Sequence, residues 1–77
     1  MPVDLAKVFG RRLRKYRSQR GWTQRHLAEK AGLHQNEIGL LERGARSPTL
    51  LTFFYLCDAL KVKPRDFVAG IDFYRGW

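Results

Sequence analysis

The sequence predicts an all-α domain, and three observations support this prediction. Apolar residues recur at intervals of three and four along most of the 77 residues, which is the spacing of amphipathic helices. Residue types that begin and end helices flank these patterns: Thr23 and Thr49 suit N-caps, and Gly21 and Gly44 suit the positions just after helix ends. No segment alternates convincingly as a half-buried strand would. We therefore expect five short helices in a single domain over residues 1–77.

The first helix is expected over residues 4–20. Its apolar face should pack into the core, and that face consists of Leu5, Phe9, Leu13 and Tyr16. The opposite surface is basic and carries Arg11, Arg14 and Lys15. Such a surface either binds a polyanion or is merely solvated.

Residues 23–44 contain two short helical patterns separated by Gly32-Leu33-His34. The first pattern opens at Thr23, and the second runs from about Gln35 to Arg43 and stops at a glycine. Two helices joined by a turn of three or four residues that contains glycine are typical of a helix-turn-helix.

The fourth helix is expected to begin after Thr49 and to end near Lys61, and Pro64 suits the first position of a fifth helix over residues 64–68. Cys57 falls within the apolar stripe of the fourth helix, where a thiol acting as a small hydrophobe is favoured over a nucleophile. The residues of this stripe lie within about 160° of one another. They are Leu50, Phe53, Phe54, Leu56, Cys57 and Leu60.

Two further apolar features have no assigned place in this core. Leu51 and Tyr55 point away from the stripe and are neighbours at i, i+4. The tail, residues 70–77, is rich in aromatic side chains, Phe73 and Trp77 among them. It either folds back on the core or contacts a second subunit, and the pattern favours neither.

The charge balance indicates a polyanionic partner. The chain has 15 Lys and Arg against 7 Asp and Glu, a net charge of +8. Residues 1–20 alone carry seven basic side chains and one acidic side chain. A small domain this basic is a candidate for nucleic-acid binding.

Composition and spacing exclude several other classes. His26 and His34 lie eight residues apart without nearby cysteines, and the sequence has no glycine-rich phosphate loop. We therefore expect neither an enzyme nor a metal or cofactor site. A lone Cys57 excludes an internal disulfide and suits the reducing cytoplasm. No apolar run approaches the length of a membrane span, and no signal peptide is present, so no membrane association is expected.

The helix from Gln35 to Arg43 has distinct inner and outer faces. Ile38 and Leu41 lie on the inner face, while Gln35 and Asn36 open the outer face. Their amides donate and accept together, as reading an adenine from the major groove requires, although exposed amides are also common without a function. The outer face continues through Gly39, Leu40 and Arg43.

Glu42 is a carboxylate on the core side of this helix. A buried charge must be paired or neutralised, and Arg17 at the inner edge of the first helix is the candidate partner. The alternative is that Glu42 is simply exposed near the helix end.

Over residues 8–68 the sequence resembles the Cro/repressor-type (XRE-like) helix-turn-helix DNA-binding domains. The resemblance rests on an ordered combination of short segments rather than on any single one. They are Arg12-Leu13-Arg14, Arg17, Gly21-Trp22-Thr23-Gln24, Leu27-Ala28, Ala31-Gly32-Leu33, Gln35, Ile38, Leu41-Glu42-Arg43-Gly44, Arg46-Ser47-Pro48, Leu50, Phe53, Leu56 and Ala59-Leu60-Lys61-Val62.

The resemblance implies a five-helix fold with Gln35 and Asn36 at the start of the recognition helix, and it supports the pair of Arg17 and Glu42. It also implies that Gln24 contacts the DNA backbone and steadies Gln35. The backbone contacts expected on this basis are Gln24, Arg25, Arg43 and Arg46. His26, His34, Gly39 and Leu40 depart from the family pattern, so no base preference is transferred.

The sequence thus predicts a regulator, acting as a repressor, that binds double-stranded DNA as a homodimer. Gln35, Asn36 and Leu40 would read bases, while backbone contacts, part of the first helix among them, would set register. Leu51, Tyr55, Phe73 and Trp77 form the candidate dimer surface. The alternative is an antitoxin-like module that grips a protein partner through these same apolar residues. Membrane-surface binding by the first helix is disfavoured, because its apolar residues are needed in the core.

Overall fold

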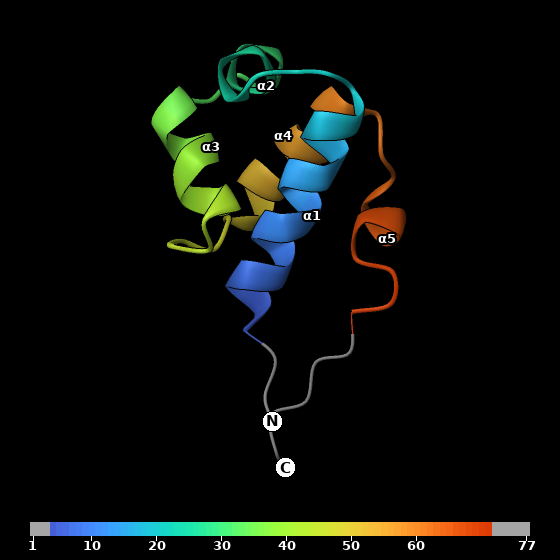
Figure 1. Ribbon diagram of the computed structural model, residues 1–77. Coiled ribbons are helices and arrows are strands. Elements are labelled where there is room, and N and C mark those ends of the chain that lie inside the picture. The colour runs from blue at the N-terminus through green and yellow to red at the C-terminus, as the bar shows by residue number, and fades with distance from the viewer. Residues whose placement is uncertain (1–3, 72–77) are drawn as a thin grey trace.

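The computed structural model describes residues 4–71, which form five helices and no strand (Figure 1). Phe73 and Trp77 lie outside the described residues. The helices are α1 (Leu5–Gln19), α2 (Gln24–Ala31), α3 (Gln35–Glu42), α4 (Leu50–Leu60) and α5 (Pro64–Phe67). The expected all-α, five-helix fold is confirmed. Within residues 4–71, every helix is too short or too polar to cross a bilayer.

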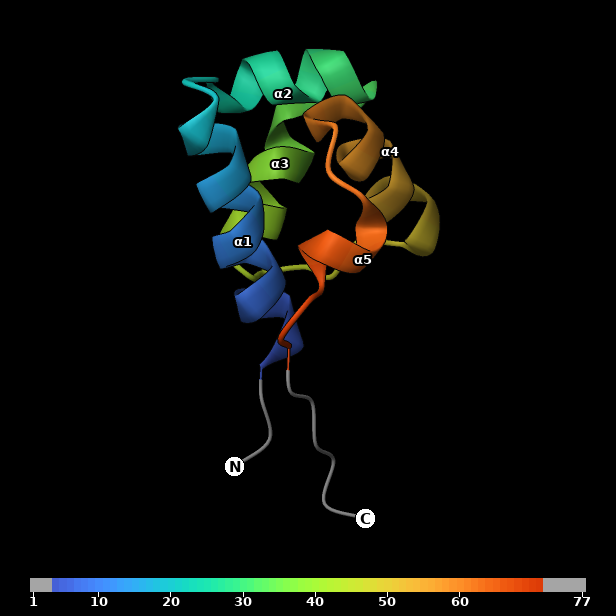
Figure 2. The ribbon, with the colours of Figure 1, turned by 90° about the vertical axis from the view of Figure 1, so that its right-hand side faces the viewer.

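The other four helices lie beside α1 or across its end, and α1 is the longest of the five. In two views at right angles, α2 lies across the end of the molecule where α1 stops, and α3 and α5 lie on different sides of α1 (Figures 1 and 2). The helix-turn-helix is therefore exposed along one side of α1 while α4 and α5 close the core on the other.

Helices α1, α2 and α4 each begin at a residue whose side chain caps the N-terminus, close to where the sequence predicts these helices to start. Asp4 accepts a hydrogen bond from the backbone N–H of Lys7 at 3.2 Å and so begins α1. Thr23 accepts from the N–H of His26 at 3.0 Å and Thr49 from the N–H of Thr52 at 3.0 Å. Each bond satisfies one of the free N–H groups of a first helical turn.

The core is apolar and involves all five helices. Phe67 brings the short α5 into it, since its fully buried ring packs 5.0 Å from the ring of Phe9 and 5.2 Å from that of Tyr16, centre to centre. Most of the other buried residues were expected from helical periodicity. They include Phe9, Leu13, Leu27, Ala28, Ile38, Leu41, Leu56, Cys57 and Leu60.

Three residues assigned to the core by periodicity are exposed. Leu50 is 72% exposed, Phe54 48% and Leu5 43%. The apolar stripe of α4 is wider than the surface that α2 and α5 cover, so its edges face solvent. Leu5 lies at the free end of α1, in an open hollow that it shares with Val68. The prediction of a broad core face for α4 was therefore wrong at its margins.

Cys57 is buried among apolar side chains, as expected. Burial raises the pKa of its thiol, because the thiolate loses hydration in this setting. The raised pKa keeps Cys57 in its neutral form, which suits a packing role rather than a nucleophilic one.

Arg12 of α1 and Arg20, the residue that caps its C-terminal end, bind backbone carbonyls of other segments. Arg12 donates from Nη1 to the carbonyl oxygens of Phe67 at 2.8 Å and Ala69 at 2.5 Å. Arg20 donates to the carbonyl oxygen of Leu60 at 2.5 Å, at the end of α4. These contacts tie the ends of α5 and α4 to α1. These two arginines therefore stabilise the fold, whereas Arg11, Arg14 and Lys15 of the expected basic face are exposed.

Candidate nucleic-acid interface

The helix-turn-helix consists of α2, the turn Gly32–His34 and α3. Gly32 ends α2 with φ of 72°, a left-handed conformation that glycine adopts without steric cost. His34 occupies the N-cap position of α3 but makes no side-chain capping bond. Ile38 and Leu41 are fully buried and anchor α3 to the core. The opposite edge of α3 is left facing solvent.

Asn36 and Leu40 form the outermost edge of α3, one helical turn apart. An open hollow lies on each side of this edge, and both residues line both hollows. Gln24, Gln35, Gly39 and Arg43 complete one hollow. Asn36 and Gln35 are exposed and Leu40 is half-buried. All three side chains expected to read bases are thus on the accessible side of α3.

Arg43 and Arg46 flank this edge at the end of α3 and just beyond it. Arg43 is exposed and forms no ion pair among residues 4–71. Arg46 instead donates from Nη1 to Oε1 of Glu37 at 2.6 Å. No sequence pattern indicates this pair, because its members lie nine residues apart across the end of a helix.

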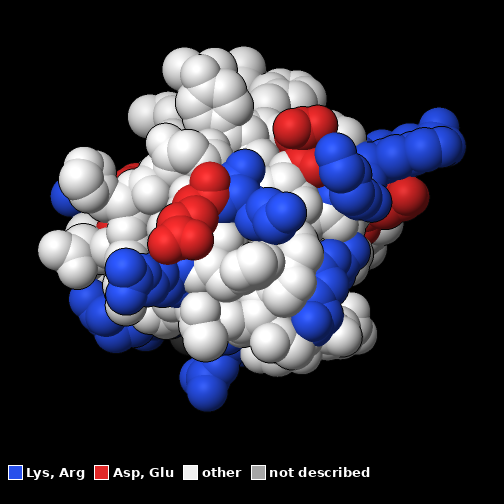
Figure 3. All heavy atoms as spheres, turned by 90° about the horizontal axis from the view of Figure 1, so that it is seen from above, with Lys and Arg blue, Asp and Glu red and all other residues white. Residues whose placement is uncertain are grey.

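Arg25 lies in the first turn of α2 and is also exposed. Its Nε is 3.4 Å from Oε1 of Glu29, a solvated pair one turn along the helix. Viewed from the end where α2 lies, Lys and Arg side chains are scattered over the face and its edges, with acidic side chains beside some of them (Figure 3). The cations there do not form one uninterrupted basic face.

Gly39 lines the hollow on the outer face of α3, the face on which it was predicted, but it is not exposed. It is buried, and a Cβ built on it would lie 3.3 Å from Nη1 of Arg43 and 3.7 Å from Oε1 of Gln24. The long side chains of these two residues close over the glycine. A helical projection ignores neighbouring side chains, so it could not reveal this cover.

Arg17 and Glu42 form the ion pair that the sequence suggested, and it joins α1 to α3. Arg17 donates from Nε to Oε2 at 2.5 Å and from Nη2 to Oε1 at 2.9 Å, a bidentate geometry. Their side chains are only 14% and 4% exposed. The hydrogen bond to Glu42 raises the pKa of Arg17, despite the opposing effect of its own burial.

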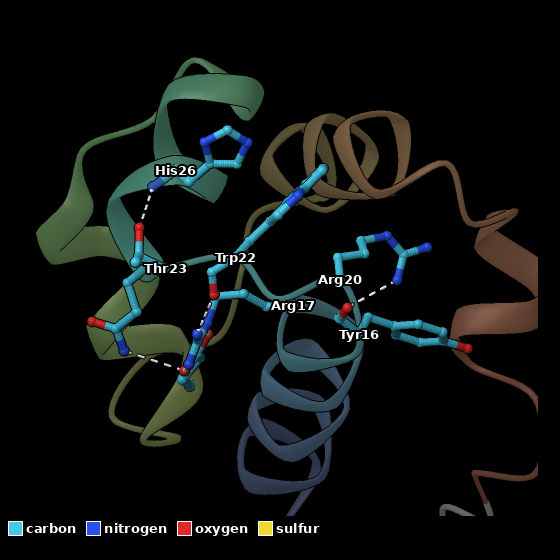
Figure 4. Close-up of polar contacts among 8 residues, drawn as sticks. Tyr16, Arg17, Arg20, Trp22, Thr23 and His26 are labelled. Carbon is cyan, nitrogen blue, oxygen red and sulfur yellow. Dashed lines mark hydrogen bonds and ion pairs between the residues drawn. The ribbon is translucent and has the colours of Figure 1, made fainter.

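Two further groups complete the surroundings of this pair. Arg17 also donates from Nη1 to the carbonyl oxygen of Trp22 at 2.7 Å (Figure 4). Gln24 donates from Nε2 to Oε1 of Glu42 at 3.2 Å. One carboxylate therefore connects α1, the start of α2 and α3. Gln24 was expected to steady Gln35, but within residues 4–71 its hydrogen bond goes to Glu42 instead.

Gly10 is a structural residue that the sequence reasoning missed. A Cβ built on it would contact the carbonyl oxygen of Leu41 and would lie 2.6 Å from that of Glu42. Only a glycine lets the backbone of α1 approach the last turn of α3 this closely. A lone glycine within a helical pattern was the available signal.

A helix-turn-helix with an accessible outer edge, flanked by arginines and held against a packed core, defines a DNA-binding domain of the regulatory class. A family model described as a helix-turn-helix domain matches residues 8–69. The chain belongs to the Cro/repressor-type (XRE-like) family of helix-turn-helix domains. It is therefore a helix-turn-helix transcriptional regulator that binds DNA, and not an enzyme.

The similarity extends to individual relatives. The chain is 33% identical over 70 residues to y4dJ, an uncharacterized HTH-type transcriptional regulator of Sinorhizobium fredii, covering 91% of each chain. It superposes on the restriction-modification controller protein C.AhdI of Aeromonas hydrophila with a TM-score of 0.78 and 37% identity, over 80% of this chain and 94% of that one.

The biofilm regulator SinR provides two further comparisons. A structure of SinR in complex with DNA matches with a TM-score of 0.73 and 26% identity, over 78% of this chain and 97% of that one. A structure of SinR in complex with the protein SinI matches with a TM-score of 0.75 and 25% identity, over 80% of this chain and 61% of that one.

Proposed function

We propose that this protein is a sequence-specific repressor that places α3 in the major groove and binds as a homodimer. The accessible edge of α3 carries the proposal, since Gln35, Asn36 and Leu40 lie together on it with Arg43 beside them. Amide side chains can read adenine edges, and arginines can hold the backbone. Repression would follow from occupying DNA that the transcription machinery needs.

The substitution Gln35→Ala tests base reading. Removing this amide should reduce the difference in binding free energy between the preferred base pair and the others by roughly 1–3 kcal/mol at one position. The reason is that the bidentate hydrogen bonds to the preferred base are lost. Selection from a random duplex library should give a site with one relaxed position per half-site. Arg43→Gln is the matched control, and it should weaken binding to all sequences alike. An unchanged consensus for Gln35→Ala would refute the assignment.

The dimer is proposed to form through the exposed apolar residues of α4. Leu51 is 60% exposed and Tyr55 45%, and their neighbours Leu50 and Phe54 extend the same surface. The candidate residues Phe73 and Trp77 belong to the segment that the structure does not describe. A two-fold dimer presents two copies of α3, which suits half-sites about one helical turn apart.

Leu51→Asp should convert the dimer to a monomer, because it places a charge within an apolar contact. Sedimentation equilibrium measures the mass directly. Lys61→Asp, at the end of α4 and 82% exposed through its side chain, provides a control that changes charge on the same helix. A wild-type protein that is monomeric on its selected DNA would contradict the proposal.

A second candidate function is antitoxin-like binding of a different protein through the same α4 surface. The exposed apolar residues favour it, and one solved structure contains the similar protein SinR in complex with the protein SinI. Copurification distinguishes the two roles. If the antitoxin-like role is correct, a second protein copurifies with wild type in stoichiometric amount and is lost with Leu51→Asp.

A further inference from the structure

The Glu37–Arg46 pair lies at the edge of the surface proposed to face DNA. Glu37 is in the first turn of α3, two residues after Gln35, and Arg46 is in the segment after α3. Both line the hollow beside Asn36 and Leu40. A carboxylate here is unexpected, because every nearby phosphate would repel it.

The ion pair with Glu37 uses only part of the hydrogen-bonding capacity of Arg46. Its Nη1 donates to Oε1 of Glu37 at 2.6 Å, while its side chain remains 56% exposed. A guanidinium has five N–H donors in a fixed plane. The donors not bonded to Glu37 have no hydrogen-bond partner within residues 4–71, and the ion pair ties the guanidinium to α3. Glu37 is the more enclosed partner, with its side chain 22% exposed, and so acts as the fixed end.

We propose that Glu37 is a specificity-determining residue that acts by positioning Arg46. The inference rests on the proposed function. A held guanidinium meets a phosphate only when α3 is docked in one register, so its contact adds to the binding of a matched site. A freed arginine would reach phosphates in any register and would strengthen binding to arbitrary sequences, while the matched site would lose its pre-oriented contact.

The carboxylate of Glu37 also favours the matched site over DNA of other sequences. On DNA of arbitrary sequence, affinity comes almost entirely from phosphate contacts, and each cation engaged contributes to the salt dependence. Glu37 withholds Arg46 from these contacts unless the docking is correct. The simpler interpretation is that Glu37 only stabilises the first turn of α3 through its interaction with the helix dipole. That role would change thermal stability without changing the preference between DNA sequences.

Glu37→Gln separates the two interpretations. Affinities would be measured by fluorescence anisotropy for two 30-base-pair duplexes: the site that wild type enriches from a random library, and a duplex of arbitrary sequence. We expect binding to the arbitrary duplex to tighten roughly fivefold, with its salt slope steeper by about one phosphate contact. Binding to the selected site should weaken, so that the ratio of the two affinities falls about tenfold.

The double variant Glu37→Gln, Arg46→Gln tests whether Glu37 acts through Arg46. In the background of Arg46→Gln, the change at Glu37 should leave the affinity ratio unaltered. Asp58→Asn is the matched control, because it removes the same charge from an exposed pair with Lys61 on α4. It should leave the ratio at its wild-type value.

Two results would overturn the inference. One is an affinity ratio for Glu37→Gln equal to that of wild type, with only the thermal midpoint lowered. The other is a reduced ratio that persists when Arg46 is absent. Failure of the proposed function would look different, since wild-type protein would then enrich no site from the library at all.

Discussion

Replacing Glu42 with leucine is expected to lower the free energy of unfolding by about 3–5 kcal/mol. The substitution leaves the guanidinium of Arg17 in a site where its side chain is only 14% exposed, without the carboxylate that accepts two of its hydrogen bonds. The amide of Gln24 also loses its acceptor. A domain of 77 residues typically has a stability of about 4–12 kcal/mol, so the loss would be a large fraction of the total.

Urea denaturation of Arg17→Met, Glu42→Leu and the double variant measures the coupling directly. Each single variant leaves one charge unpaired, whereas the double variant leaves none. The double variant should therefore be more stable than the sum of the single effects predicts, by at least about 2 kcal/mol. Strictly additive losses would show that the two side chains do not stabilise each other.

Gly10→Ala is the second substitution with a large expected effect. The added methyl group would meet backbone carbonyls of α3, with the carbonyl oxygen of Glu42 2.6 Å away. Backbone cannot rotate aside as a side chain can, so α1 and α3 must separate. We expect a loss of about 1–3 kcal/mol in denaturant unfolding, even though alanine favours a helix over glycine.

Gly39→Ala is the matched control, since it makes the same change within a helix. Here the nearest atoms to the new Cβ are the ends of two flexible side chains, those of Arg43 at 3.3 Å and Gln24 at 3.7 Å. Both can shift by a few tenths of an ångström. The variant should be as stable as wild type or more stable by up to about 1 kcal/mol. A similar loss for both glycines would contradict the close-packing explanation.

The local structure of this protein was largely predictable because its signals lie within one or two helical turns. Thr23 and Thr49 cap the helices that they were expected to cap, and Gly44 follows α3 in a left-handed conformation, with φ of 71°. The inner face of α3 also follows from periodicity, since Ile38 and Leu41 are fully buried. These features depend on neighbours three or four positions away, and the sequence displays such neighbours directly.

The errors concern contacts between segments that are distant in the chain. Leu50 and Phe54 satisfy the apolar spacing of α4, yet whether they are covered depends on the width of the neighbouring helices. The contacts of Arg12 and Arg20 were not predicted, because their acceptors are backbone carbonyls, which every residue type carries. The Arg17–Glu42 pair could be inferred only because a carboxylate on an inner face demands a partner.

The outer edge of α3 is independent of the interactions that stabilise the domain. Among residues 4–71, the side chains of Gln35, Asn36 and Leu40 take part in no hydrogen bond or ion pair, while the carboxylate of Glu42 and the backbone of Gly10 hold α3 in place from behind. Under the proposed function, substitutions at the three outer positions therefore change which DNA is bound at little cost in folding. The domain is consequently suited to diversification, in nature or by library design, because new specificities can arise without compensating changes elsewhere in the chain.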